Sequence, residues 1–238
     1  MNILIACEES QRVCTEFRKL GADAYSCDIL ETSGNHPEWH IKESVIPLLN
    51  GNCSFTTQDG VLHTIKGRWD AIIAFPPCTH LAISGARHFE QKRKDGRQKE
   101  GIEFFLTILE ADCDYMCVEN PTNIITGGNY IREWFPEYSS RIKDSTQIIQ
   151  PYFFGDTFKK TTHLWLKGLP NLTPTDIVKP QLVHYVSADG SIKTFSADYS
   201  KVGKNRSTQR SKTYPGVAKA MATQWYPFLQ SVLSITTD

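Results

Sequence analysis

Cys78 follows a buried run and two prolines. Residues 71–75 read AIIAF, an apolar run that predicts a buried strand, and Pro76 and Pro77 come directly after it. Because proline fixes the backbone angle φ, we expect Cys78 to stand on a rigid rim at the end of this strand. A thiolate there is a candidate nucleophile. The alternative is that Cys78 is a small apolar side chain that only fills space.

Glu119 lies at the end of the next apolar run, YMCVEN at 115–120, and follows Cys78 by 41 residues. If the two strands are parallel neighbours, their carboxyl ends lie side by side. A thiolate and a carboxyl group suit attack on an electron-poor pyrimidine ring: sulfur adds to a ring carbon while the carboxyl group protonates or hydrogen-bonds a ring nitrogen. The alternative for Glu119 is a strand-end carboxylate that caps the following Asn-Pro-Thr-Asn turn.

Alternating strands and helices must position these two side chains. Solid apolar runs of this kind predict an α/β fold with a doubly wound, mostly parallel, Rossmann-like sheet that is covered on both faces. Ligands of such folds bind at the carboxyl ends of the strands. The patterns predict strands at 2–7, 23–29, 70–75 and 115–120, helices at 9–21, 98–111 and 214–234, a short helix within 42–51, and a hairpin at 53–67 that turns at Asp59-Gly60.

Acidic residues follow the first two predicted strands. Glu8 and Glu9 follow the first strand, and Asp28 lies at the end of the second. An acid at the end of the second strand is where a doubly wound fold binds ribose hydroxyls, which predicts an adenosine-type cofactor. The alternatives are that Asp28 caps a turn and that Glu8 or Glu9 is an acid favoured at a helix start.

The composition excludes several classes of protein. The chain has 238 residues, a formal net charge of zero, no apolar run near 18 residues, and no basic leader before its first strand. Its seven cysteines have no zinc spacing, so we expect reduced thiols in the cytoplasm, no metal site and no membrane contact.

Residues 141–219 carry 13 Lys and Arg against 5 Asp and Glu, with the densest basic stretch at 201–212. Such runs are usually solvated loops, but they also suit a local polyanion footprint.

At these residues the sequence resembles the cytosine-5 DNA methyltransferases, and most closely the short methyltransferase-like proteins of phages and prophages. The family's Pro-Cys motif after a strand matches Pro77-Cys78, and its Glu-Asn-Val motif is approximated by Glu119-Asn120-Pro121. The resemblance implies that RSKTYPGVAKAMA, 210–222, packs back beside the first strand and completes a pocket for S-adenosylmethionine. It implies transfer of a methyl group to carbon 5 of cytosine in DNA, with Cys78 and Glu119 as the catalytic residues.

The resemblance also implies the contacts of cofactor and substrate. The residues implied for S-adenosylmethionine are Ala6, Cys7, Glu8, Ser10, Asp28, Ile29, Phe75, Pro76, Pro77 and Tyr214. The residues implied for the DNA target are Thr79, His80, Asn120, Pro121, Lys159, Lys160, His163, Arg206 and Arg210.

Three parts of the chain are expected: a catalytic and cofactor-binding core at 1–169, a small basic recognition region at 170–209, and a C-terminal helix at 210–238 that returns to the core. A hairpin within 182–197, turning at Asp189-Gly190, is expected in the recognition region. The turn after the first strand has no glycine, and the recognition region is short. Two alternatives therefore stay open: the same chemistry on a free pyrimidine nucleotide, or a catalytically inactive relative that binds nucleic acid.

Overall fold

A seven-stranded sheet forms the centre of the computed structural model, which describes residues 1–126, 129–196 and 211–235. Five neighbouring strands run parallel, while β9 is antiparallel to both of its neighbours. The α/β class and the mostly parallel sheet are thus confirmed. In spatial order the strands are β3 (His40–Lys42), β2 (Asp23–Asp28), β1 (Asn2–Ala6), β6 (Ala71–Ala74), β7 (Met116–Pro121), β9 (Thr162–Lys167) and β8 (Gln147–Ile149).

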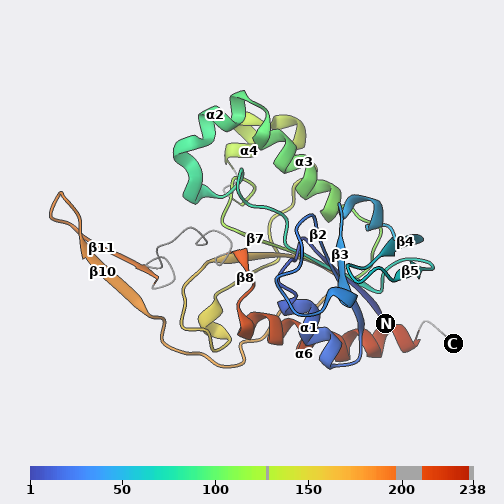
Figure 1. Cartoon of the computed structure of the whole chain (residues 1–238). Helices are drawn as coiled ribbons and strands as arrows, with labels where there is room; N and C mark the ends of the chain where they lie inside the picture. The colour runs from blue at the N-terminus through green and yellow to red at the C-terminus, as the bar shows by residue number, and fades with distance from the viewer. Residues whose placement is uncertain (127–128, 197–210, 236–238) are drawn as a thin grey trace.

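Helices cover both faces of the sheet, which is why the central strands are apolar on both sides. In Figure 1, α1 (Arg12–Lys19) and α6 (Pro215–Ile235) lie below the sheet, and α2 (Phe89–Lys94), α3 (Arg97–Leu109) and α4 (Asn129–Trp134) lie above it. Each face has its own core. The lower core contains Ile3, Ile5, Phe17, Met221 and Trp225, and the upper core contains Leu4, Ile72, Ile102, Phe105 and Val118.

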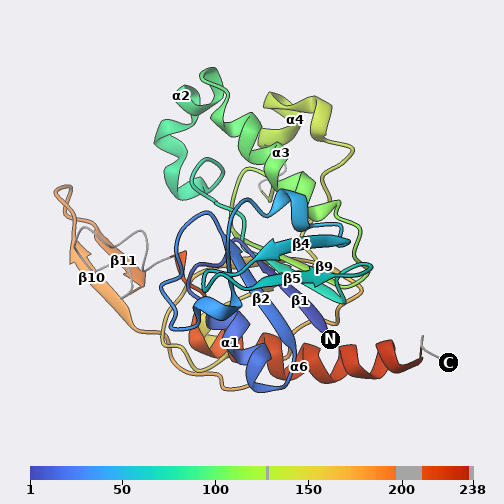
Figure 2. The ribbon, with the colours of Figure 1, turned by 45° about the vertical axis from the view of Figure 1, so that its right-hand side comes forward.

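Two antiparallel ribbons stand apart from the main sheet. The first, β4 (Cys53–Thr56) with β5 (Leu62–Ile65), confirms the predicted hairpin, and Gly60 at its turn has a φ of 91°. The second, β10 (Leu182–Val186) with β11 (Ile192–Ser196), confirms the hairpin expected in the recognition region. This second ribbon projects from the body of the protein in both views (Figures 1 and 2).

The structure differs from the sequence prediction at the start of one helix and in several elements that were not predicted. Helix α1 begins at Arg12 rather than at residue 9, because Cys7 and Gln11 adopt φ values of 59° and 55° in the turn before it. The short helix expected within 42–51 is a single 3-10 turn, Ile46–Leu48, at Pro47. Helices α2 and α4 and strands β3, β8 and β9 were not predicted. Other 3-10 turns are Pro37–Trp39, Ile83–His88, Pro136–Tyr138 and Pro151–Phe153.

No helix within the described ranges combines the length and the apolar character needed to cross a bilayer.

Candidate functional site at the carboxyl ends of β1, β6 and β7

The carboxyl ends of three parallel neighbours, β1, β6 and β7, meet at one edge of the sheet. Ala6 of β1 pairs with Ala74 of β6, and Ala74 pairs in turn with Val118 of β7. The chain leaves β1 toward β2 on one side, whereas β6 continues to β7 on the other. The point between β1 and β6 is therefore the topological switch point, where doubly wound sheets bind their ligands.

Asn120 joins the ends of β6 and β7. Its amide Nδ2 donates a hydrogen bond of 2.8 Å to the carbonyl oxygen of Pro76, and its Oδ1 accepts one of 2.8 Å from Asn123. Both asparagines are buried. The resemblance implied that Asn120 contacts the substrate. In the structure its amide group is hydrogen-bonded to the segment that leads to Cys78.

A second connection joins the segments that follow the two strands. The backbone of Ile83 donates to Thr122 and the backbone of Ile124 donates to Leu81, which forms a short antiparallel bridge. The side chain of Asn123 accepts hydrogen bonds from the N–H groups of Ile125 and Thr126. This role of Asn123 was not predicted, although an asparagine that caps the turn after it is a known local pattern.

Cys78 itself is half-buried, between an exposed Pro77 and an exposed Thr79. Its carbonyl oxygen accepts hydrogen bonds from the N–H groups of Leu81 and Ala82, so the chain folds into a tight turn directly after the thiol-bearing residue. No disulfide joins any of the seven cysteines, all of which lie in the described ranges.

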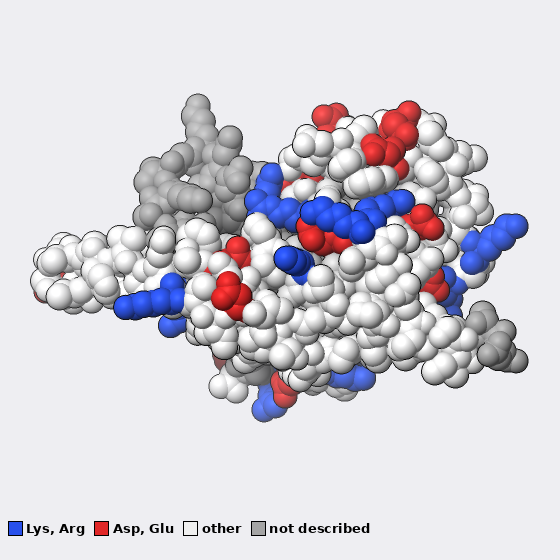
Figure 3. All heavy atoms as spheres, turned by 90° about the horizontal axis from the view of Figure 1, so that it is seen from below, with Lys and Arg blue, Asp and Glu red and all other residues white. Residues whose placement is uncertain are grey.

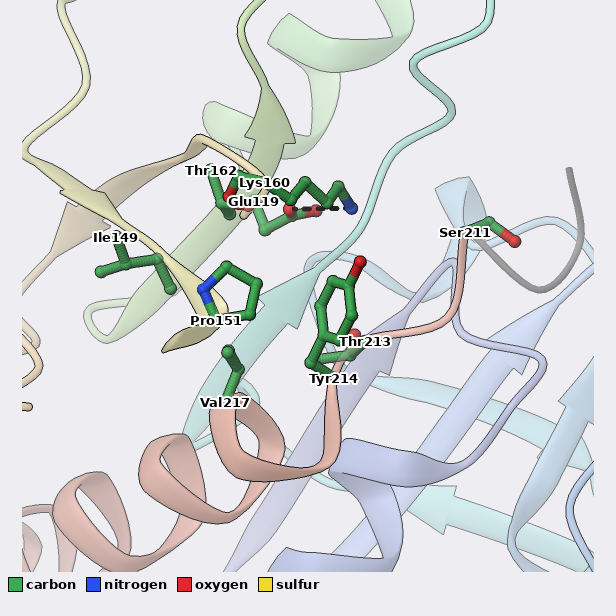
Figure 4. Close-up of a pocket in the computed structure, with 9 residues that line it drawn as sticks. All are labelled: Glu119, Ile149, Pro151, Lys160, Thr162, Ser211, Thr213, Tyr214 and Val217. Atoms are coloured by element: carbon green, nitrogen blue, oxygen red, sulfur yellow. Dashed lines mark hydrogen bonds and ion pairs between the residues drawn. The ribbon is translucent and has the colours of Figure 1, made fainter. Parts of the chain in front are cut away.

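Glu119 lines a small pocket on the lower side of the sheet. One of its carboxylate oxygens lies 3.9 Å from Lys160 Nζ, and the two side chains are only 15% and 21% exposed. In Figure 4, Tyr214 rises from the segment before α6, and its hydroxyl points toward this pair. The other lining residues are Ile149, Pro151, Thr162, Ser211, Thr213 and Val217.

Burial raises the pKa of Glu119, and the nearby Lys160 opposes this shift. We expect Lys160→Gln to raise the pKa of Glu119 further, because the one opposing cation is then gone. The measurement is a carboxyl titration by carbon NMR, with Glu119→Gln to identify the signal. Lys159→Gln is the matched control, since Lys159 is exposed. An unchanged or lower pKa in Lys160→Gln would contradict the pairing.

The turn after β1 is built around a buried carboxylate. Glu8 is 4% exposed, and its two oxygens accept hydrogen bonds from the N–H groups of Val13 and Cys14, at 2.7 and 3.1 Å, in the first turn of α1. Glu8 was expected among the cofactor contacts, yet its carboxylate caps the helix, which was the alternative interpretation. Burial raises the pKa of Glu8 to about 7.

This raised pKa makes stability depend on pH. Folded Glu8 keeps its proton up to about pH 7, whereas the unfolded chain loses it near the ordinary value of 4.5. The stabilisation is therefore fully present below pH 4.5 and is lost as the pH rises to about 7. We expect Glu8→Gln, which resembles the protonated form, to reduce the fall in unfolding free energy between pH 5 and pH 8 by about 2 kcal/mol.

Urea denaturation at several pH values measures this effect. Glu16→Gln is the control, because Glu16 lies on the same helix, is partly exposed and pairs with Lys19. If the unfolding free energy falls equally in wild type and in Glu8→Gln between pH 5 and pH 8, the prediction is refuted.

The segment before α6 packs against this turn. Lys212 Nζ lies 3.8 Å from a Glu9 carboxylate oxygen and donates to Ser33 Oγ at 2.6 Å. Arg12 of α1 donates to the carbonyl oxygen of Thr213 at 2.6 Å. Residues far apart in the chain thus meet at the end of β1, on the side where the resemblance expects the C-terminal segment.

Asp28 is half-buried at the end of β2, and one of its oxygens accepts a hydrogen bond of 2.9 Å from the N–H of Leu30. Burial raises its pKa. The two apolar side chains that follow, Ile29 and Leu30, are 73% and 56% exposed. An acid beside exposed apolar side chains can bind a ligand that has both hydroxyl groups and a flat apolar ring.

The other expected site residues fall into two groups. Ala6, Ser10, Phe75, Pro121 and Tyr214 lie at the same edge of the sheet or beside it. His163 is buried, with its ring nitrogens 3.2 Å from Thr122 Oγ1 and 2.9 Å from Ser145 Oγ, and His80 points toward α3. Lys159 is tied through its backbone N–H to Ser196 of β11. Arg206 and Arg210 lie outside the described residues.

Charged side chains are sparse on the face shown in Figure 3. Lys and Arg form a short row there, with acidic side chains beside it, and much of the face is uncharged. Among the residues that the structure describes, no three His, Cys, Asp or Glu side chains lie close enough together to hold a metal ion.

No protein-family model matches the chain, and a search of curated proteins finds no match either.

Proposed function

We propose that this protein is an S-adenosylmethionine-dependent methyltransferase that modifies carbon 5 of cytosine in DNA through a covalent adduct with Cys78. The observation that carries the proposal is the tie between Asn120 and the carbonyl of Pro76. It holds the Cys78 turn and the Glu119 strand together at the switch point of a doubly wound sheet.

The chemistry requires a nucleophile and a proton donor beside one ring. The Cys78 thiolate adds to carbon 6 of cytosine, and the electron pair of the 5,6 double bond moves toward carbon 5. Glu119, whose raised pKa favours the protonated form, donates to ring nitrogen 3. Carbon 5 would take its methyl group from the sulfonium of the cofactor, which would be left as a neutral thioether. A base would then remove the carbon-5 proton, the carbon–sulfur bond would break to restore the double bond and the thiolate, and ring nitrogen 3 would return its proton to Glu119.

The residues at the ends of β1 and β2 fit S-adenosylmethionine, which supplies an electrophilic methyl group when bound. Its sulfonium, ammonium and carboxylate groups sum to one positive charge, which the Asp28 carboxylate complements, whereas Glu9 already faces Lys212. Glu9 Oε1 is buried without a hydrogen-bond partner in the described structure and lies 3.8 Å from Lys212 Nζ, so a ligand donor that reached it would share it with that cation. Asp28 suits the ribose hydroxyls, and Ile29 and Leu30 suit the adenine ring.

The sheet also supports the finer assignment to the methyltransferase class. If the β4–β5 hairpin is left out, the first five main strands follow the order 3-2-1-4-5. This is the order of the doubly wound folds that bind adenosine-containing cofactors.

The β10–β11 ribbon suits contact with DNA. A two-stranded ribbon fits the major groove, and this one projects from the body. In the sequence it is followed by the basic stretch 201–212. Cations of that stretch suit phosphates, which position a protein without specifying sequence. The target cytosine would be flipped out or single-stranded, because a base inside a duplex is out of reach.

Mass spectrometry of nucleosides tests the proposal. The full chain is incubated with S-adenosylmethionine and either random-sequence DNA or free deoxycytidine monophosphate. We expect 5-methylcytosine in the DNA arm alone. Methylation of the free nucleotide alone would favour the first alternative, and DNA binding without methylation in either arm would favour the inactive relative.

A further inference from the structure

The turn that carries Cys78 is held from outside by α2 and α3. Lys92 Nζ of α2 donates a hydrogen bond of 2.5 Å to the carbonyl oxygen of Thr79, the residue after Cys78. Gln98 Nε2 of α3 donates one of 3.3 Å to the carbonyl oxygen of His80. Two successive carbonyl groups of this turn therefore have side-chain donors from helices that follow it in the chain.

Lys92 is an unusual lysine because only 8% of it is exposed. Among the described residues, no carboxylate lies within ion-pair distance of its ammonium group. The acidic residue on the same helix, Glu90, pairs with the exposed Lys94 at 2.7 Å. Burying a cation without an opposite charge is costly, so packing alone does not explain why a lysine stands here.

The charges around this turn leave Lys92 uncompensated. His80 faces Arg97, Asp95 and Glu100 in addition to Lys92. Arg97 and Asp95 form their own ion pair at 2.5 Å. Glu119 lies at the end of the neighbouring strand β7 and pairs with Lys160 at the small pocket on the lower side of the sheet. Lys92, which is bonded to the backbone beside Cys78, is thus a buried cation with no carboxylate in contact among the described residues.

We propose that Lys92 is a positioning residue that fixes the Cys78 turn and whose positive charge stabilises the Cys78 thiolate. The ammonium group contacts the carbonyl oxygen of Thr79, the residue after Cys78, so the charge lies beside the backbone of the turn that carries the thiol. A partly buried site weakens solvent screening, and a nearby lysine favours the thiolate over the thiol. The importance of this effect for methyl transfer rests on the proposed function.

The rate of alkylation at Cys78 tests the inference without any turnover. The full-length protein is treated with iodoacetamide between pH 6 and pH 9, and peptide-resolved mass spectrometry separates Cys78 from the other thiols. We expect Lys92→Gln to slow alkylation of Cys78 about 10-fold at pH 7, as the thiolate fraction falls. The rate should approach the wild-type value at high pH. Lys94→Gln on the same helix is the matched control and should leave the rate unchanged.

Each outcome decides the inference. An unchanged or faster rate in a folded Lys92→Gln variant would overturn it, since loosening of the turn alone would expose the thiol. If the Lys92→Gln variant does not fold, Lys92→Met replaces it in the same measurement, because methionine keeps the apolar part of the lysine side chain. Trapping with DNA that contains 5-fluorocytosine is measured separately. If the lysine variants are alkylated slowly and wild type forms no trapped adduct, the role of Lys92 is supported and the proposed function is refuted. If wild type forms the adduct and the lysine variants are alkylated at the wild-type rate, only the role of Lys92 is refuted.

Discussion

Replacing Cys78 with alanine should abolish covalent capture of DNA that contains 5-fluorocytosine. Once carbon 5 has received the methyl group, the fluorine that it carries cannot be removed as a proton, so the elimination that breaks the bond between Cys78 Sγ and carbon 6 is blocked. Wild-type protein incubated with this DNA and S-adenosylmethionine should therefore accumulate as an adduct. Methyl transfer to normal DNA should fall by at least ~10⁴-fold, the scale seen when a nucleophile is removed from a covalent enzyme. Intact-mass spectrometry measures the adduct.

Cys53→Ala is the matched control, because Cys53 is another partly buried thiol but lies on the β4–β5 ribbon. It should retain the adduct. An adduct that persists in Cys78→Ala would remove Cys78 from the role of nucleophile, and a wild-type protein that forms none would contradict the covalent mechanism.

Replacing Asp28 with alanine should weaken binding of S-adenosylmethionine by about 5- to 150-fold, which corresponds to 1–3 kcal/mol. The carboxylate would otherwise accept hydrogen bonds from the ribose hydroxyls, and its negative charge complements the cationic cofactor. Isothermal titration calorimetry with S-adenosylmethionine measures the affinity without turnover.

Asp28→Asn separates the local structural role from the binding role, because its amide oxygen can still accept the hydrogen bond from the N–H of Leu30. It should bind more tightly than the alanine variant and less tightly than wild type. Asp59→Ala, a change at the turn of the β4–β5 ribbon, should have no effect. Unchanged affinity in Asp28→Ala would exclude this residue from the cofactor site.

Local sequence patterns predicted most of the fold. The apolar runs that became β1, β2, β6 and β7 are buried on both faces, and such strands are recognisable from composition alone. Both ribbons were predicted from Asp-Gly turns, since glycine takes the positive φ that the turn needs. The antiparallel direction of β9 was not predicted, because a buried run of six residues carries no information about strand direction.

The candidate site was predicted only in part. Cys78 and Glu119 were proposed because Cys78 follows one predicted strand, Glu119 lies at the end of the next, and their types suit one reaction; their catalytic role stays a prediction. The structural role of Asn120 was not predicted, because its hydrogen bond reaches Pro76, 44 positions earlier in the chain. Nor could Glu8 be separated from the cofactor contacts, because a carboxylate before a helix suits both a cap and a ligand.

The sequence by itself therefore determined the strands β1, β2, β6 and β7, the two ribbons, and the thiol and carboxyl pair that suits chemistry on a pyrimidine. Only the tertiary structure decided what surrounds them: Lys92 against the turn of Cys78, Lys160 against Glu119, and Lys212 against Glu9. The physical reason is that propensity and periodicity depend on neighbours along the chain. A buried charge, by contrast, depends on groups that meet only when the sheet and its helices have packed.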